Sequence, residues 1–355
     1  MIMNKKELRK GWTTGACATA AARAAYGALL TGEFCDPVQI RLPKGQTPSF
    51  CLNRQGVSQQ SAWAAVIKDA GDDPDITHGA EIVVCVERGE PGSGIVFKNG
   101  AGVGVVTKPG LPLAVGEPAI NPMPRQMITD NLNEVQENPD VIVTISITKG
   151  EELAQKTMNP RLGILGGLSV LGTTGIVVPY SCAAWIHSIH RGIDVARALG
   201  IGHMAATTGS TSEKTVVDKY GLEESALIDM GDFAGGVLKY VRQKPIDKLT
   251  LCGGFAKLCK LAQGEMDLHS SRSRLDFDRL AQWMKEAGAN EDLQNQSRNA
   301  NTALEVLMLA LDHNIALGDL VACRAKEVAQ AVVSGHCHIE IIAINRFGDI
   351  VGHAE

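Results

Sequence analysis

The chain has 355 residues, a length that favours two domains over a single buried core. Its residues are 45% hydrophobic and 21% charged, which is the composition of a folded globular protein and excludes a disordered chain. The net charge of −5, without a run of basic residues, excludes a nucleic-acid partner.

We expect neither a leader nor a membrane-spanning segment in this chain. The opening MIMNKKELRKG lacks the apolar region of a signal peptide, and no window approaches about 18 continuous apolar residues. We therefore expect a cytoplasmic protein without a membrane partner. The nine cysteines are scattered singly, which argues against a disulfide scaffold or a zinc ribbon, and no protein-bound metal is expected.

The first predicted element is a helix from about residue 16 to residue 30. It follows from the stretch LRKGWTTGACATAAARAA, in which Thr13 or Thr14 can cap the helix and Gly32 can close it. Its alanines leave room for another backbone or for a ligand. Residues 37–110 then alternate as strands do.

A helix near 125–136 and the strand VIVTISIT at 141–148 complete the first half of the chain. Strands and helices alternate after this point, with the strands HMAATTG, ALIDM and KLTLCGG. This pattern predicts a mostly parallel sheet in which ligands bind outside the carboxyl ends of the strands. Helices are expected at 182–199, 211–220, 232–243, 254–263, 277–287, 300–313 and 317–333, before a last strand HIEIIAINR.

The expected fold class is therefore α+β followed by α/β. Residues 1–150 are predicted to form a β-rich α+β domain with the alanine-rich helix at its start. Residues 151–355 are predicted to form a mostly parallel α/β domain with glycine-rich turns and a helical C-terminal third.

Two glycine-rich segments are candidates for ligand binding. In NPRLGILGGLSVLGTTGIVVPYS, at 159–181, either backbone N–H groups bind a carboxylate or phosphate, or tight turns pack closely. The second segment, ATTGSTSEKT at 206–215, follows a strand and opens a helix. Glu213 stands where an ATP-binding loop needs a glycine, so the ATP interpretation fails.

Other motifs are weaker. GAGVG at 100–104 lacks the last glycine of a dinucleotide fingerprint. The acidic turn DAGDDPD offers Asp72, Asp73 and Asp75 to a metal, but an ordinary turn is favoured. His336 and His338 lack an evident third ligand.

Six segments, taken together and in this order, resemble the CbiD family, the methyltransferases that act on cobalt-precorrin-5B in anaerobic cobalamin synthesis. The similarity covers nearly the whole chain, and Thr-Thr-Gly, INPMPR and LGTTGIV are its most specific parts. The segments are LRKGWTTGACATAAARAA, DAGDDPDITHGAEI, VGVVTKPGLPLAVGEPAINPMPRQMI, NPRLGILGGLSVLGTTGIVVPYS, GDF and KLCKLAQGEMDLHS.

The resemblance implies that S-adenosyl-L-methionine donates a methyl group to ring carbon 1 of a cobalt-bearing tetrapyrrole. It also implies a fold different from that of the usual tetrapyrrole methylases. Many relatives have a Gly-His pair where this chain has Gly254-Phe255, so a role for that histidine cannot be carried over.

The expected site residues follow from this chemistry. A sulfonium methyl group is already electrophilic, so positioning is the enzyme's main task, and no catalytic residue is predicted. The carboxylates of the substrate call for cations or helix N-termini. The substrate-binding candidates are Thr13, Thr14, Gly15, Lys108, Arg125 and Arg161.

The cofactor is expected at the turns from Gly166 to Gly175 and from Thr207 to Ser212, with Asp229 accepting from a ribose hydroxyl. Two alternatives stay open, namely that Asp229 caps the next helix and that Thr13 and Thr14 merely cap a buried one. The cofactor-binding candidates are Gly166, Gly167, Gly172, Thr173, Thr174, Gly175, Thr208, Gly209, Ser210 and Asp229.

Two other functions compete with methyl transfer. A non-catalytic tetrapyrrole carrier would need a macrocycle site but no cofactor site. A nicotinamide-dependent oxidoreductase is suggested only by the α/β pattern and GAGVG, and the incomplete fingerprint disfavours it. A homo-oligomer is compatible with the sequence.

Overall fold

The computed structural model describes residues 8–335 and 337–355. The chain divides into two compact units, of which the first ends at Cys182 and the second runs from Ala183 to Glu355. In these described ranges, none of the helices combines the length and apolarity that crossing a bilayer requires.

The division falls later than the boundary expected near residue 150. The segment after that residue pairs with strands of the first unit, because β11 (Ile164–Leu165) joins β9 (Val105–Val106), and β12 (Gly167–Leu168) joins β8 (Gly102–Val103). The glycine-rich segment therefore belongs to the first unit and not to the parallel sheet.

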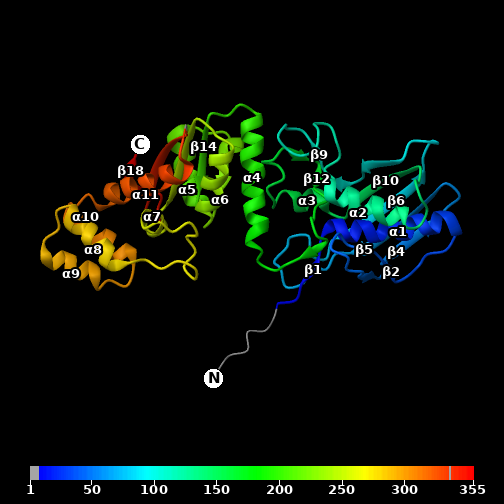
Figure 1. Cartoon of the computed structure of the whole chain (residues 1–355), viewed down its shortest axis with the longest axis horizontal. Helices are drawn as coiled ribbons and strands as arrows, with labels where there is room; N and C mark the ends of the chain where they lie inside the picture. Colours follow the sequence, from blue (N-terminus) through cyan, green and yellow to red (C-terminus); the bar gives the residue numbers. More distant parts are fainter. Residues whose placement is uncertain (1–7, 336) are drawn as a thin grey trace, which may run out of the picture. The chain divides into compact units, whose positions relative to one another are not determined.

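The first unit is built on a five-stranded sheet that is packed against helix α1 (Figure 1). The strand order is β4-β5-β6-β10-β7, and all neighbours are antiparallel except β10 and β7. The predicted β-rich α+β architecture is confirmed. The elements are α1 (Thr14–Thr31), β4 (Arg54–Val57), β5 (Ser61–Ile67), β6 (Glu81–Arg88), β7 (Ile95–Asn99), α2 (Pro122–Asn133), β10 (Val141–Ile147) and α3 (Gly150–Ala154).

Helix α1 forms because both of its ends are satisfied locally. Thr13 is the N-cap and its hydroxyl accepts from the Ala16 N–H, while Gly32 closes the helix in a left-handed conformation with φ of 82°. The alanines are buried against β5 and β6, and alternate residues of these strands, such as Ala62 and Ala64, face them. Protein atoms therefore fill the room that the alanines leave.

Two further small strand pairs, β1-β13 and β2-β3, complete the connections of the first unit, together with the two pairs named above. The first of them joins residues 11–12 to the glycine-rich segment, because Gly11 pairs with Val177 and Trp12 with Ile176. The remaining strands are β1 (Gly11–Trp12), β2 (Val38–Gln39), β3 (Ser49–Phe50) and β13 (Ile176–Val177).

The second unit contains the parallel sheet that the sequence predicts. Its order is β15-β14-β16-β17-β18, and only β18 is antiparallel to its neighbour. The strands are β14 (His203–Thr207), β15 (Leu227–Asp229), β16 (Lys248–Gly254), β17 (His338–Ile344) and β18 (Ile350–Ala354). The helices are α4 (Cys182–Ala198), α5 (Ser210–Tyr220), the 3-10 turn η1 (Glu224–Ala226), α6 (Ala234–Gln243), α7 (Phe255–Ala262), α8 (Phe277–Glu286), α9 (Glu291–Arg298), α10 (Ala303–Asp312) and α11 (Leu317–Val333).

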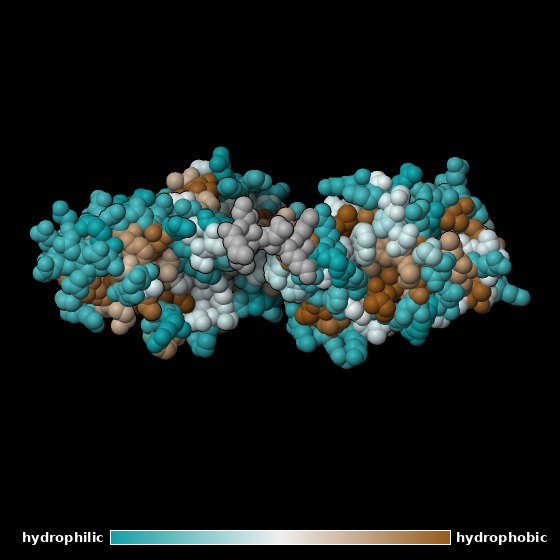
Figure 2. Space-filling model, turned by 90° about the horizontal axis from the view of Figure 1, so that it is seen from below, coloured by the Kyte–Doolittle hydropathy of each residue, from teal (hydrophilic) through white to brown (hydrophobic). Residues whose placement is uncertain are grey.

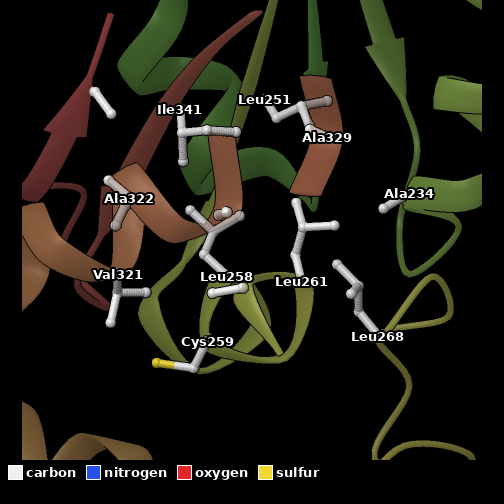
Figure 3. Close-up of a cluster of buried hydrophobic side chains, with 14 of the residues drawn as sticks. Ala234, Leu251, Leu258, Cys259, Leu261, Leu268, Val321, Ala322, Ala329 and Ile341 are labelled. Carbon is white, nitrogen blue, oxygen red and sulfur yellow. The ribbon is translucent and has the colours of Figure 1, made fainter. Parts of the chain in front are cut away.

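Each face of this sheet has its own helices. On one face, Leu258 and Leu261 of α7 and residues of α11 pack against Leu251 and Ile341 of the strands (Figure 3). On the other face, α5 covers alternate residues such as Ala205 and Cys252. In the view of Figure 2, hydrophilic side chains cover much of the visible surface and hydrophobic residues form separate patches.

The order of the strands creates a topological switch point between β14 and β16. The chain moves from β14 to β15 on one side and then to β16 on the other side of β14. In open parallel sheets, ligands bind at the carboxyl ends of the strands where the connections diverge in this way. A ligand site is therefore expected at the carboxyl ends of β14, β15 and β16.

Candidate functional site

The ends of β14 and β16 are tied closely together at the switch point. The Thr208 N–H donates to the Cys252 carbonyl at 3.1 Å. A Cβ atom at Gly253 would lie 2.6 Å from the Thr208 side chain, so only glycine allows this approach. The second glycine-rich turn is thus held in place by the neighbouring strand.

Helix α5 begins at Ser210, directly after this turn. The Ser212 hydroxyl donates to the Gly209 carbonyl at 2.7 Å and accepts from the Thr208 N–H at 3.1 Å. A Cβ atom at Gly209 would meet no atom within 4 Å. The N–H groups of the first helical turn have no preceding turn to bond, so this open space suits an anionic group.

Thr207 adds an unsatisfied hydroxyl beside the same turn. Its residue is 1% exposed, and no group in the described part of the chain is hydrogen-bonded to its Oγ1. By the alternation of β14, Thr207 shares the face of Ala205, which packs with α5. Leaving a buried hydroxyl unpaired costs about 1–3 kcal/mol, so this group points to a ligand near the start of α5.

Asp229 ends the neighbouring strand and lies opposite Thr207 in the sheet register. It follows Gly209 by about 20 residues, the spacing at which an acid binds the ribose in dinucleotide folds. The alternative that Asp229 caps the next helix is wrong, because α6 begins at Ala234 with Phe233 as its N-cap. The predicted Thr208, Gly209, Ser210 and Asp229 are therefore brought together at one sheet edge.

Two charged residues at this edge were missed from the sequence. Lys257, near the start of α7, donates from Nζ to the Thr208 carbonyl at 3.2 Å. The same Nζ lies 3.1 Å from Asp232 Oδ1, in an ion pair without the alignment of a hydrogen bond. Both residues follow strands, at the Gly-Gly end of β16 and after β15, and that position is the signal that could have identified them. Phe255 is 4% exposed and packs in the core.

The Thr-Thr-Gly turn of the first unit does not present free groups. Thr14 is 3% exposed, and its hydroxyl both donates to the Leu171 carbonyl and accepts from the Leu171 N–H, each at 3.1 Å. The Gly15 N–H also donates to the Leu171 carbonyl at 3.0 Å, and the Thr13 N–H donates to the Gly175 carbonyl at 3.0 Å. The expectation that Thr13, Thr14 and Gly15 offer open hydroxyls and N–H groups to a substrate is therefore wrong, because the glycine-rich segment already occupies them.

The first glycine-rich turn mostly packs against its own chain. A Cβ atom would lie 2.2 Å from Thr13 Oγ1 at Gly172, 2.5 Å from Leu42 at Gly175, and 2.3 Å from the Gly102 backbone at Gly167. Gly166 alone among the four glycines predicted in this turn has no atom within 4 Å of that position. The close-packing alternative thus accounts for Gly167, Gly172 and Gly175. Of the two threonines, Thr173 is exposed, and Thr174 donates to the Ile176 carbonyl at 3.2 Å.

The three predicted cations have different surroundings. Arg125, in the first turn of α2, is bound to the loop before this helix, since it donates to Glu117 and to the Ile120 carbonyl, both at 2.8 Å. Lys108 lies beside Arg161, because its Nζ donates to the Arg161 carbonyl at 3.3 Å. The structure therefore brings Lys108 and Arg161 together, and it pairs Arg125 with Glu117.

The acidic segment DAGDDPD after β5 forms a turn whose aspartates bind groups of the protein. Asp75 pairs with the buried Lys68, Asp72 accepts from the Arg9 N–H, and Asp73 accepts from the Tyr180 N–H. His336 lies outside the described residues, and His338 is an exposed residue at the start of β17.

A separate polar cluster lies where β16 and β17 begin, away from the carboxyl edge. Glu340, His353 and Glu355 are close enough together to share a metal ion. Lys248 Nζ already lies 3.4 Å from Glu340 and 2.9 Å from Glu355, so a side-chain cation is present there. Burial raises the pKa of Glu340, but hydrogen bonds from Thr250, Tyr220 and His353, together with the Lys248 charge, outweigh it and lower the pKa to about 2.

Comparison with known proteins gives a consistent result. The family model described as CbiD matches residues 1–179, and the one described as CbiD, C-terminal domain, matches residues 267–355. A protein of Brucella anthropi named Cobalt-precorrin-5B C(1)-methyltransferase is 55% identical over 352 residues, which are 98% of this chain and 96% of that protein. A protein of Paramagnetospirillum magneticum with the same name is 53% identical over 358 residues, covering 99% of this chain and 100% of that protein.

A solved structure also matches. It is the 1.9 Å crystal structure of the cobalamin biosynthesis protein (cbiD) from Archaeoglobus fulgidus, which is 29% identical to this chain. The match covers 75% of this chain and 83% of that one, with a TM-score of 0.41.

Proposed function

The chain belongs to the CbiD family, and we propose that it transfers a methyl group to ring carbon 1 of cobalt-precorrin-5B in cobalamin biosynthesis. The observation that carries this proposal is the identity of 53–55% to curated methyltransferases over 98–99% of the chain. Agreement along the whole length includes both units, so the proposal applies to the complete chain and not to one domain.

We propose S-adenosyl-L-methionine as the methyl donor and the carboxyl edge of the second sheet as its site. The residues there fit this molecule. The first turn of α5 and the unsatisfied Thr207 hydroxyl suit the carboxylate of the methionine part. The Asp229 carboxylate, opposite Thr207, suits the ribose hydroxyls.

Methyl transfer from this donor depends more on positioning the two reactants than on reactive side chains. The donor supplies an electrophilic methyl group, so the protein has to hold it in line with the ring carbon and keep water away. The rigid turn from Thr207 to Ser212, braced by the Thr208 and Ser212 hydrogen bonds, suits this task. We assign no general base.

For the carboxylates of the tetrapyrrole we propose Lys108 and Arg161, which lie side by side in the first unit. Gly166 and Thr173, which also belong to the first unit, remain cofactor contacts predicted from the sequence alone. The cytoplasmic location and a homo-oligomeric state remain predictions from the sequence.

The decisive experiment is incubation of the protein with cobalt-precorrin-5B and methyl-labelled S-adenosyl-L-methionine, followed by mass analysis. We expect the tetrapyrrole to gain one labelled methyl group. Calorimetric titration with S-adenosylhomocysteine and with NADH accompanies the assay. Binding of the tetrapyrrole without binding of S-adenosylhomocysteine and without a mass gain would favour a carrier instead.

A further inference from the structure

One aromatic side chain lies exposed beside the proposed cofactor site. Trp185, in the first turn of α4, is 47% exposed, whereas Trp283 of the same unit is 4% exposed. Its Nε1 donates to the Asp229 carbonyl at 3.2 Å. This bond holds the indole at the end of β15, next to the acid that is proposed to bind the ribose.

The indole is also supported from the protein side. A Cβ atom at Gly231 would lie 3.3 Å from Cζ2 of the Trp185 ring, so glycine lets the ring lie close to the backbone. The ring centroids of Phe233 and Trp185 are 6.2 Å apart, and the planes of the two rings are tilted by 51°. The hydrogen bond, Gly231 and Phe233 together hold a large aromatic surface in a defined position while part of it stays exposed.

We propose that Trp185 is the stacking platform for the adenine base of the methyl donor. The inference rests on the proposed function and identifies the residue that recognises the purine. The base is joined directly to the ribose, so a ribose on the Asp229 carboxylate places the base within reach of a ring bonded to the Asp229 carbonyl. Flat bases bind to proteins largely by stacking on such side chains.

The flat tetrapyrrole is the less suitable ligand for this surface. Its carboxylates require cations, but the strand end and loop beside Trp185 carry the acids Asp229 and Asp232. The nearby cation Lys257 is already paired with Asp232. Arg272, whose guanidinium lies 5.4 Å from the Phe233 ring centroid, is paired with Asp267. An uncharged purine avoids repulsion from these acids, whereas a polycarboxylate does not.

The test compares ligand binding by wild type and by variants at Trp185. S-adenosylhomocysteine and adenosine are titrated by calorimetry into wild type, Trp185→Leu and Trp185→Tyr. We expect Trp185→Leu to raise the Kd of both ligands by roughly 5- to 150-fold, the range for loss of one stacking contact. Trp185→Tyr, which keeps an aromatic ring, is expected to retain most of the affinity.

Tryptophan fluorescence supplies a readout that a merely structural role would not change. Adenosine is expected to quench the emission of wild type and to leave Trp185→Tyr, with its three other tryptophans, nearly unchanged. Trp63→Phe, in the first unit, is the matched control and should be quenched like wild type. The wild-type arm of this measurement stands even if Trp185→Leu fails to fold.

The outcomes separate this inference from the proposed function. If wild type transfers the methyl group and binds S-adenosylhomocysteine, but Trp185→Leu binds it within twofold of wild type, the stacking role is overturned and the function stands. If cobalt-precorrin-5B quenches Trp185 and adenosine does not, the platform serves the macrocycle and the inference fails. If wild type binds neither S-adenosylhomocysteine nor adenosine, both the donor assignment and the inference fall.

Discussion

Replacing Thr14 with valine separates a structural role of the Thr-Thr-Gly turn from a role in substrate binding. Valine has nearly the shape of threonine, so the change removes the hydroxyl without opening a cavity. In the structure that hydroxyl accepts from the Leu171 N–H and donates to the Leu171 carbonyl. The carbonyl keeps the Gly15 N–H as a donor, but the Leu171 N–H loses its acceptor.

The lost hydrogen bond should lower the free energy of unfolding of Thr14→Val. The Leu171 N–H is left without an acceptor in a region where Thr14 is 3% exposed, so the free energy of unfolding should fall by about 1–3 kcal/mol. The measurement is urea denaturation of wild type and Thr14→Val, monitored by fluorescence and circular dichroism. Methyl transfer, measured under conditions where both proteins are folded, should change little.

Thr19→Val is the matched control on the same helix. Thr19 is also fully buried, and its hydroxyl donates to the Gly15 carbonyl at 2.8 Å. That carbonyl keeps its bond from the helix backbone, so the same chemical change should cost less than about 0.5 kcal/mol. If Thr14→Val is as stable as wild type but loses methyl transfer, the hydroxyl serves the substrate and the structural explanation is refuted.

Three further predictions test the two units. Asp229→Asn should weaken S-adenosylhomocysteine binding by about 10- to 100-fold in calorimetry, because a charge-assisted bond to the ribose is lost; equal loss in the exposed control Asp218→Asn would contradict the assignment. Gly172→Ala should lower the free energy of unfolding, measured in urea, by about 2–5 kcal/mol, because φ at Gly172 is 132° and a Cβ atom has no room there. The control Gly166→Ala, where a Cβ atom meets open space, should lower it by about 1–2 kcal/mol. The pKa of Glu340 is lowered from 4.5 to about 2, so its ionised form stabilises the fold above pH 4.5 and this stabilisation is lost as the pH falls through about 2. The free energy of unfolding should therefore depend less on pH in this acid range for Glu340→Gln than for wild type. Parallel curves of unfolding free energy against pH would refute the prediction.

The sequence by itself determined the features that arise from local rules. A threonine cap and a closing glycine predict helix α1, and the observed bounds, Thr14–Thr31, agree closely with the predicted ones. The alternation of short apolar strands with helices predicts the parallel sheet of the second unit, because each pattern depends on residues near one another in the chain. The family, too, could be identified from ordered motifs along the sequence.

Only the tertiary structure decided what each glycine-rich turn faces. Sequence shows that something approaches such a backbone closely, but the neighbour comes from a distant part of the chain, as when Thr13 fills the space at Gly172. Near Gly209 the corresponding space stays open, and the unpaired Thr207 hydroxyl lies on the same edge. Trp185 and Lys257 reach that edge from helices α4 and α7, and the sheet order alone brings them there, because strand pairing and not chain proximity sets which strand ends meet.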